Sequence, residues 1–320
     1  MKKVLVSGAS GIIGYGILRS LKLSEKKLHL IGTTIYNDSP AEGFCDIFEQ
    51  AIPTDDINYI DWLLKIIKKH EVDFIIPGIE TDMYKWLNYK AKIETSGAKV
   101  LLNNTELISL CNDKWMFYEK LTENNVINAI HTTLDSDFET LKKTFGLPFL
   151  LKPRSGHGSK GIVKINNNEE FVKHKESIGP VLMVQPIVGN DDQEYTTSAF
   201  CDGKGGFYAY MTLKRKLSKD GFTEKAEVVD LEDIENVLGL LCELFKPIGP
   251  TNFQFRKDKG VLKLLEINPR ISSSTSIRSK FGYNEALMSI NYFLEGKEII
   301  QPFIKKGKAI RYIEDLIIYE

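Results

Sequence analysis

The stretch Leu264-Leu265-Glu266-Ile267-Asn268-Pro269-Arg270 is the most informative part of this sequence. Successive side chains of a β-strand point to opposite faces, so Glu266 and Asn268 share one face and the apolar residues beside them share the other. A carboxylate and an amide oxygen two residues apart are hard ligands that an octahedral magnesium ion accepts. Arg270 could hold the phosphate or carboxylate that accompanies such an ion. The stretch therefore predicts a metal site that handles phosphate, although an exposed polar strand end is an equal alternative from these residues alone.

Composition and charge bound the class of protein. With 320 residues, 42 % of them apolar, the chain can bury a large core, and its length favours two or three domains. The 42 basic and 43 acidic residues are interspersed and give a net charge of −1, so we expect no nucleic-acid or membrane partner. The sequence shows neither a secretory signal nor a stretch long enough to span a membrane, which predicts a soluble, cytoplasmic protein.

The cysteine spacing excludes two further classes of protein. Cys45, Cys111, Cys201 and Cys242 lie far apart, and no two of them form a CxxC pair. This spacing argues against a zinc knot and against a secreted disulfide framework. We expect reduced thiols in the core.

The N-terminal third of the chain alternates short apolar runs with amphipathic stretches. Strands are predicted at residues 4–7, 28–34, 74–77 and 99–102. Strands that alternate with helical patterns are typical of a parallel α/β layer. This pattern extends to about residue 110.

The rest of the chain has a different texture. A helix from Asn112 to Leu121, a second helix at 140–145 and a strand at 149–152 predict a smaller α+β lobe. Longer strands, separated by turn signals, are predicted at 194–201, 207–214, 251–256 and 261–267, with helices at 232–245 and 284–294. We expect these strands to form a mostly antiparallel sheet that the two helices cover.

The glycine-rich segment Gly8-Ala9-Ser10-Gly11-Ile12-Ile13-Gly14 lies between a predicted strand and a predicted helix, where dinucleotide-binding loops occur. The next strand ends in Gly32-Thr33-Thr34 and offers no acidic residue for a ribose hydroxyl. Tyr210 and Lys214 have the Tyr-x-x-x-Lys spacing of short-chain reductases, but in a strand they lie about 13 Å apart. An NAD(P)-dependent reductase is therefore an alternative and not the preferred interpretation. The glycines more readily explain close strand-to-helix packing, with an anion at the helix N-terminus as an option.

Four features after residue 110 suit a bound nucleotide. Lys114 begins a helix and Lys152 ends an apolar strand, although either lysine alone could simply be solvated. The turn from Arg154 to Gly161 is rich in glycine, so its amides can approach a polyphosphate closely. The segment from Met183 to Gly189 reads as a strand that runs into an extended connector, which could present backbone groups to an adenine edge while Glu194 reaches the ribose.

In this order the motifs resemble the ATP-grasp superfamily, in particular the group like the large subunit of carbamoyl-phosphate synthetase and like biotin carboxylase. The resemblance covers essentially the whole chain. It implies an α/β and α+β architecture: a Rossmann-like pre-ATP-grasp domain at 1–110, a small ATP-grasp lobe with the glycine-rich loop at 111–182, and a large lobe with the metal site at 183–320.

The resemblance also implies a set of site residues. The lysines would bind phosphates, the glycine-rich loop would cover them, the hinge would hold adenine, and an acidic residue would bind the ribose; these nucleotide-binding residues are Lys114, Lys152, Ser155, Gly156, Gly158, Ser159, Gly161, Gln185, Ile187 and Glu194. Gln254, Glu266 and Asn268 match the magnesium ligands, and Arg270 matches the arginine beside the transferred phosphate. Two positions depart from the usual pattern, because Gln185 and Gln254 stand where acidic residues are frequent. The second departure removes a negative charge from the metal ligands.

The implied activity is that of an ATP- and Mg²⁺-dependent ligase, with Mn²⁺ as an alternative metal. It would activate a small-molecule carboxylate as an acyl phosphate and join it to an amine or a similar nucleophile. A non-catalytic ATP-binding subunit is a further alternative, and a homodimer is compatible with the resemblance. No biotin carrier, glutaminase or second ATP-grasp copy is visible, so neither carboxylation nor the complete synthesis of carbamoyl phosphate is implied.

The basic, glycine-punctuated segment 214–225 is the candidate acceptor region. It could line the acceptor pocket, with Arg215 and Lys225 as carboxylate binders, because charged side chains near a metal site have groups to pair with. A solvated loop is an equal alternative.

Overall fold

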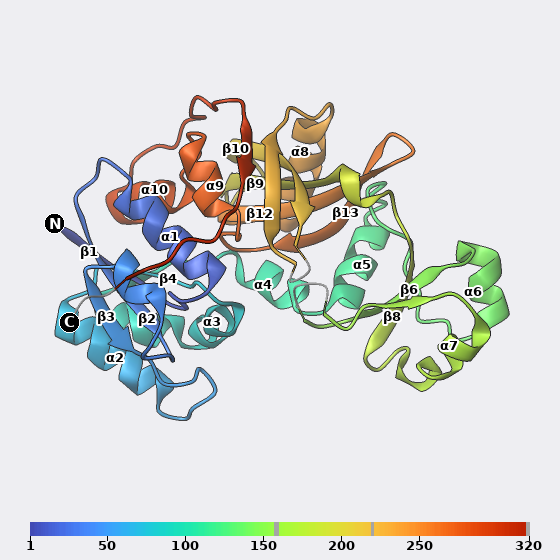
Figure 1. Cartoon of the computed structure of the whole chain (residues 1–320), viewed down its shortest axis with the longest axis horizontal. Helices are drawn as coiled ribbons and strands as arrows, with labels where there is room; N and C mark the ends of the chain where they lie inside the picture. The colour runs from blue at the N-terminus through green and yellow to red at the C-terminus, as the bar shows by residue number, and fades with distance from the viewer. Residues whose placement is uncertain (157–159, 219–220, 318–320) are drawn as a thin grey trace.

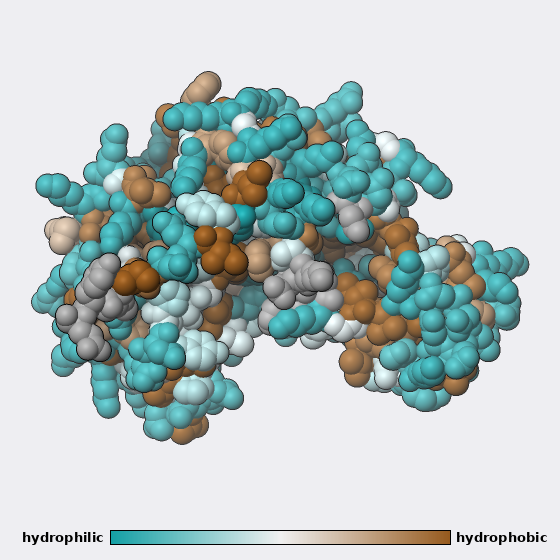
Figure 2. Space-filling model, viewed as in Figure 1, coloured by the Kyte–Doolittle hydropathy of each residue, from teal (hydrophilic) through white to brown (hydrophobic). Residues whose placement is uncertain are grey.

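The computed structural model describes residues 1–156, 160–218 and 221–317, which form three β-sheets and the helices that cover them (Figure 1). The smallest sheet and its helices project from the rest of the molecule, and a hollow separates this part from the N-terminal layer (Figure 2). No helix in these ranges is both long and apolar enough to cross a membrane.

The N-terminal layer is a parallel five-stranded sheet in the order β3-β2-β1-β4-β5. Its strands are β1 (Lys2–Val6), β2 (Leu28–Thr34), β3 (Ile47–Gln50), β4 (Phe74–Ile76) and β5 (Lys99–Val100). Its helices are α1 (Ile12–Lys22), the 3₁₀ turn η1 (Pro40–Phe44), α2 (Tyr59–His70), α3 (Glu80–Thr95) and α4 (Thr105–Cys111). The predicted parallel α/β layer is confirmed, and only the short edge strand β3 was not expected.

The glycine-rich loop between β1 and α1 allows close packing, as the sequence suggested. A Cβ atom at Gly14 would lie 2.2 Å from the carbonyl oxygen of Gly8, and one at Gly78 would lie 2.1 Å from the carbonyl oxygen of Ser7. No side chain fits at these separations. The β1–α1 turn can therefore be this tight, and the end of β4 can lie this close to it, only because Gly14 and Gly78 have no side chains.

The small lobe contains the antiparallel sheet β7-β6-β8. Its elements are α5 (Lys114–Glu123), α6 (Phe138–Phe145), β6 (Phe149–Pro153), β7 (Val163–Ile165), α7 (Asn168–Val172), the 3₁₀ turn η2 (Lys175–Ser177) and β8 (Leu182–Pro186). The predicted boundary between residues 182 and 183 falls inside β8. Because β8 pairs with β6 along its whole length, this sheet extends to Pro186.

The large lobe contains the six-stranded sheet β13-β12-β9-β10-β11-β14. Its strands are β9 (Glu194–Asp202), β10 (Phe207–Leu217), β11 (Thr223–Val228), β12 (Ile248–Asp258), β13 (Val261–Asn268) and β14 (Lys308–Ile310). Its helical elements are η3 (Asp191–Gln193), α8 (Ile234–Phe245), α9 (Thr275–Lys280), α10 (Glu285–Ser289) and the π-helical η4 (Ile290–Leu294). The expectation of a solvated loop over 214–225 is wrong at its ends, because β10 continues to Leu217 and β11 begins at Thr223.

The two faces of the large sheet are buried by different partners. Phe253 and Phe255 of β12 pack against Leu238 and Leu241 of α8 in one apolar cluster. On the other side α9 and α10 contact α1 of the N-terminal layer (Figure 1). The polar side chains that alternate with the core residues therefore lie between the sheet and the N-terminal layer.

Candidate active site

One cavity of about 350 Å³ brings together side chains from all three parts of the fold. Most of the sequence-predicted site residues line it: Lys114, Lys152, Ser155, Gly156, Gln185, Ile187, Glu194, Arg215, Gln254, Glu266, Asn268 and Arg270. Ile12 and Ile13, at the start of α1, line it as well. The cavity, which we call the main cavity, thus joins residues as far apart in the chain as Ile12 and Ser273.

Two predicted residues of the described chain, Gly161 and Lys225, do not line the main cavity. Gly158 and Ser159 lie outside the described residues. Gly161 lies beside Pro153 at the base of the glycine-rich turn, and it has a φ angle of +76°. Lys225 is exposed on β11, so the structure does not bring it to the site as a carboxylate binder.

The three predicted metal ligands lie side by side on neighbouring strands. Gln254 of β12 is paired directly with Glu266 of β13, and Asn268 follows on the same face of β13. The Nδ2 atom of Asn268 donates to Oε1 of Glu266 at 3.0 Å. The antiparallel register therefore gathers the three oxygen-bearing side chains that the sequence pattern suggested.

The donor set suits magnesium better than a metal that needs a full protein cage. Among the described residues there is no group of three or more His, Cys, Asp or Glu side chains that could hold a metal ion. One carboxylate and two amide oxygens leave coordination positions for substrate phosphates and water, and Mg²⁺ usually binds in this way. Gln254, Glu266 and Asn268 therefore fit a magnesium ion that arrives with a nucleotide.

The charges around Glu266 keep its carboxylate ionised. Burial raises the pKa of Glu266, but Lys152, Asn268, Lys114 and Arg270 together outweigh burial, so the net pKa is lowered. Burial lowers the pKa of Lys152, and Glu266 offsets only part of that effect. The site thus holds a carboxylate that can bind a cation beside lysines that can face phosphate.

The glycine-rich turn is attached to the start of α5. Lys114 donates from Nζ to the carbonyl oxygen of Gly156 at 2.6 Å, and Ser155 donates from Oγ to the carbonyl oxygen of Asn112 at 2.9 Å. Gly156 has a φ angle of +117°, a conformation that only glycine adopts readily. These contacts place the beginning of the turn at the cavity wall next to Lys114.

The predicted adenine hinge lies at the end of β8. Gln185 donates from Nε2 to Oγ1 of Thr132 at 2.7 Å, and Ile187 is exposed towards the main cavity. The hydrogen bond to Thr132 orients the side chain of Gln185, the neutral residue that stands where acidic residues are frequent. The adenine-binding role of both residues stays a prediction.

Glu194 is buried between two arginines. Its Oε1 accepts from Nη2 of Arg215 at 2.9 Å, and its Oε2 accepts from Nη2 of Arg256 at 2.9 Å. Arg215 also donates to Oε1 of Gln254 at 2.6 Å, which links the predicted ribose-binding residue to a predicted metal ligand. Sequence reasoning found Arg215 but assigned it to substrate, and it missed Arg256. The signal for Arg256 was its position two residues after Gln254, on the same face of the strand.

Arg270 is held by a residue that the sequence did not suggest. Its Nε donates to Oε1 of Glu80 at 3.1 Å, and its Nη2 donates to Oδ1 of Asn268 at 3.1 Å. Glu80 is the first residue of α3, just after the predicted strand at 74–77. The guanidinium therefore connects the N-terminal layer to the metal-ligand strand.

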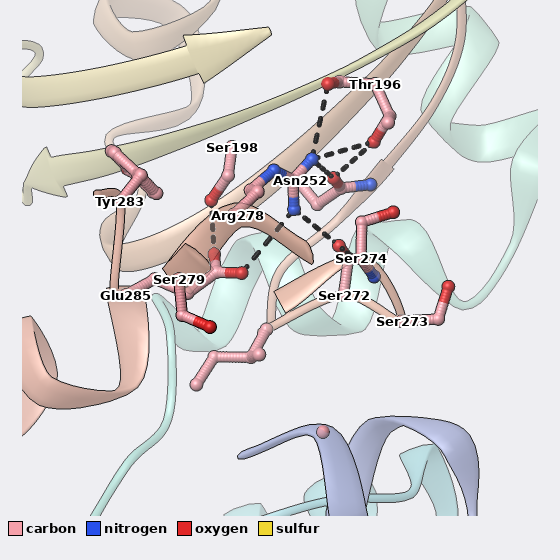
Figure 3. Close-up of polar contacts among 12 residues, drawn as sticks. Thr196, Ser198, Asn252, Ser272, Ser273, Ser274, Arg278, Ser279, Tyr283 and Glu285 are labelled. Atoms are coloured by element: carbon pink, nitrogen blue, oxygen red, sulfur yellow. Dashed lines mark hydrogen bonds and ion pairs between the residues drawn. The ribbon is translucent and has the colours of Figure 1, made fainter. Parts of the chain in front are cut away.

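A fully buried arginine, Arg278, forms hydrogen bonds with residues next to the site (Figure 3). Arg278 donates from Nη1 to Oγ of Ser272 at 2.6 Å and from Nη2 to Oδ1 of Asn252 at 2.9 Å. Its charge is balanced by Glu285, with 3.5 Å between Nη1 and Oε1, and Glu285 also accepts from Ser198. Ser272 lines the main cavity and Asn252 is the register partner of Asn268, so this network positions both sides of the site.

The reductase alternative finds no support in this geometry. Tyr210 and Lys214 both lie on β10, and the hydroxyl of Tyr210 donates to Glu235 at 2.8 Å. Neither residue lines the main cavity. A Tyr-x-x-x-Lys pair acts in proton transfer only when a helix brings the two side chains together, and a strand keeps them apart.

Comparison with known proteins confirms the predicted resemblance. Residues 179–316 match the family model described as "ATP-grasp in the biosynthetic pathway with Ter operon". The carbamoyl phosphate synthase large chain of Campylobacter jejuni is 23% identical over 308 residues, which cover 87% of this chain and 27% of that protein. The C-terminal section of the Methanocaldococcus jannaschii enzyme is 24% identical over 208 residues, or 61% of this chain and 34% of that protein. The chain thus spans about a third or less of these relatives.

Solved structures show the same fold. N5-carboxyaminoimidazole synthetase from Staphylococcus aureus has a TM-score of 0.73 at 17% identity, covering 95% of this chain and 80% of that one. The biotin carboxylase domain of Hydrogenobacter thermophilus 2-oxoglutarate carboxylase, in complex with MgADP, ADP and bicarbonate, also has a TM-score of 0.73, at 18% identity and with 96% and 73% covered. The chain therefore shares the mixed α/β fold of these two enzymes.

Proposed function

We propose that this protein is an ATP- and Mg²⁺-dependent ligase that activates a carboxylate as an acyl phosphate and joins it to an amine. One observation carries the proposal: Lys114, Lys152, Glu266, Asn268 and Arg270 meet in one cavity although they come from different lobes. The ATP-grasp family match and the ligases among its relatives support the same activity. These relatives support neither a reductase nor a non-catalytic subunit.

Each part of the main cavity has a role in this proposal. Lys114 and Lys152 offset the charge of the nucleotide phosphates, Gln185 and Ile187 hold the adenine, and Glu194 binds the ribose. A magnesium ion held by Gln254, Glu266 and Asn268 supplies neutralisation of the phosphate charge when it is bound. In this proposal the nucleotide binds in the main cavity, between the small lobe and the large lobe.

Arg270 acts at the point of transfer. Its guanidinium would hold the carboxylate of the substrate in line with the terminal phosphate and stabilise the anionic oxygens. The carboxylate oxygen then bonds to phosphorus, ADP leaves, and the acyl phosphate stays next to Arg270 until an amine attacks it.

The proposal includes a division of the chain into three domains. Residues 1–110 form a Rossmann-like domain, which the strand order β3-β2-β1-β4-β5 supports. The small lobe follows and extends to the end of β8, and the remainder is the large lobe. A cytoplasmic location and a homodimer stay predictions.

A screen of substrates tests the function. The protein, incubated with magnesium-ATP, hydroxylamine and pools of carboxylic acids, should release ADP and form a hydroxamate with at least one acid, because hydroxylamine traps acyl phosphates. Mass spectrometry identifies the hydroxamate. ATP binding without ADP or hydroxamate in any pool would contradict the ligase and favour a non-catalytic nucleotide-binding protein.

Thermal unfolding tests the nucleotide assignment. Magnesium-ATP should raise the melting temperature and NADPH should not, because a ligand that binds only the native state stabilises it, by about 2.7 kcal/mol at 100 times its Kd. Lys152→Ala should weaken ATP binding roughly tenfold or more, as expected for the loss of a charged hydrogen bond worth about 1.5–3 kcal/mol. Lys164→Ala, at an exposed position of β7, is the matched control. Stabilisation by NADPH alone, or an unchanged ATP affinity in Lys152→Ala, would overturn the assignment.

A further inference from the structure

A second cavity of about 140 Å³ adjoins the main cavity. Glu80 and Tyr84 of α3, Cys111 at the end of α4, and Phe117 and Tyr118 of α5 line it. The two cavities share five of the residues to which nucleotide or metal roles are assigned above: Lys114, Gly156, Gln185, Glu266 and Asn268. The proposed binding of nucleotide and carboxylate leaves the part around Glu80 and the aromatic side chains without a ligand. We call this space the Glu80 cavity.

Two carboxylates, Glu80 and Glu266, line the Glu80 cavity together with Lys114 and several aromatic rings. Burial raises the pKa of Tyr84 to about 12, and the carboxylate of Glu80 adds to the effect. Burial also raises the pKa of Cys111, with further contributions from Glu266 and Glu80. In both cases burial is the main cause, and the nearby carboxylates add a smaller negative contribution. Aromatic rings such as those of Phe117 and Tyr118 also attract cations.

We propose that the Glu80 cavity binds the amine substrate and that Glu80 receives its ammonium group. This inference rests on the ligase function proposed above. A cavity of about 150 Å³ holds a benzene-sized molecule, so a space of about 140 Å³ suits ammonia or a small primary amine. The lining combines two carboxylates, Glu80 and Glu266, with apolar and aromatic side chains such as Met83 and Phe117, which matches an amine with a short apolar body.

The position of Glu80 relates the amine to the point of transfer. Glu80 is joined to Arg270, and Arg270 is joined to Asn268, with 3.1 Å between the paired atoms in each case. An ammonium group bound by Glu80 therefore lies beside the guanidinium that holds the acyl phosphate. The carboxylate has two oxygens and about four acceptor sites, so it can keep Arg270 in place and bind an amine as well.

The chemical step can be written with all atoms accounted for. Glu80 takes one proton from the ammonium group, and the freed nitrogen lone pair attacks the carbonyl carbon of the acyl phosphate. The new C–N bond forms as the C–O bond to phosphate breaks, and the phosphate leaves with that electron pair. The second proton passes from nitrogen to the leaving phosphate. The products are the amide, hydrogen phosphate and a protonated Glu80, which then loses its proton to water.

Two nucleophiles distinguish this role from a structural one. Methylamine is an ammonium ion at neutral pH and needs a carboxylate that binds it and removes a proton, whereas hydroxylamine is uncharged and needs neither. With the acid found in the hydroxamate screen, Glu80→Gln should lower the ratio of methylamide to hydroxamate about tenfold or more, as expected for the loss of a charged hydrogen bond. Glu94→Gln, on the exposed side of the same helix α3, is the matched control and should keep the wild-type ratio.

A second variant tests the place of binding without removing a charge. Tyr118→Ala enlarges the Glu80 cavity and should raise the yield with benzylamine, relative to methylamine, by severalfold or more. An unchanged methylamide-to-hydroxamate ratio in Glu80→Gln, or an unchanged amine preference in Tyr118→Ala, would overturn this inference while the ligase function stands. Failure of the wild-type protein to form any hydroxamate would overturn the ligase function and the inference with it.

Discussion

Replacing Glu266 by glutamine should leave the protein folded and reduce its turnover by about 10²-fold or more. Glutamine is nearly isosteric and keeps one oxygen ligand, but the change removes the only formal negative charge among Gln254, Glu266 and Asn268. The cation that accompanies ATP is then held less tightly, and the charge that develops during transfer is less well neutralised. Losing one well-placed electrostatic contact of this kind typically costs about 10²–10³-fold in rate.

Steady-state ADP release at several magnesium concentrations, with the acid identified by hydroxamate trapping, measures this effect. Part of the lost rate should return at high magnesium, because weaker binding is offset by concentration. Glu227→Gln, at an exposed position of β11, controls for the loss of a surface carboxylate and should behave as the wild type. Full activity of Glu266→Gln with an unaltered magnesium requirement would remove Glu266 from the metal site and with it the basis of the ligase mechanism.

Arg278→Met should have the largest effect on stability. Arg278 and Glu285 are both fully buried, and removing one partner of a buried ion pair typically costs about 3–5 kcal/mol because the other charge stays behind unpaired. Methionine fills much of the same volume, so the loss reflects charge and hydrogen bonds more than packing. Denaturation in urea, followed by circular dichroism, measures the change in the free energy of unfolding.

The double variant Arg278→Met/Glu285→Gln separates charge from shape. It removes both charges and should recover part of the stability that the single variant loses, since the buried carboxylate is no longer unpaired. If the free energy of unfolding of Arg278→Met lay within about 1 kcal/mol of the wild-type value, the network in Figure 3 would not be a source of stability.

The segment 214–225 shows what the local sequence left undecided. Its many basic residues predicted either a substrate-binding or a solvated loop, because charged side chains are rarely buried. In the structure Arg215 is buried in β10, since Glu194 on the neighbouring strand and Gln254 on the next supply the acceptors that it needs. Lys225, which has the same charge, is exposed on β11. Nothing within the segment distinguishes these two residues; their partners on other strands do.

The sequence by itself determined the local geometry of this protein. Alternation from Leu264 to Arg270 predicted a strand with Glu266 and Asn268 on one face, and hydrophobic periodicity predicted the parallel N-terminal layer and most of the large sheet. These features depend on residues that are close in the chain, so the order of side chains is enough to reveal them. The family resemblance rests on the order of the motifs along the chain, and it is confirmed.

Only the tertiary structure decided which charges meet. Glu80 lies 190 residues before Arg270, and Thr196 lies 82 residues before Arg278, yet each pair is hydrogen-bonded. Strand register and the packing of α1 against α9 and α10 determine such partners. Both depend on contacts between residues far apart in the chain, which no local sequence pattern encodes. A buried charge needs a partner, but the sequence does not say which residue provides it, and so the Glu80 cavity and the Arg278 network became visible only in the folded chain.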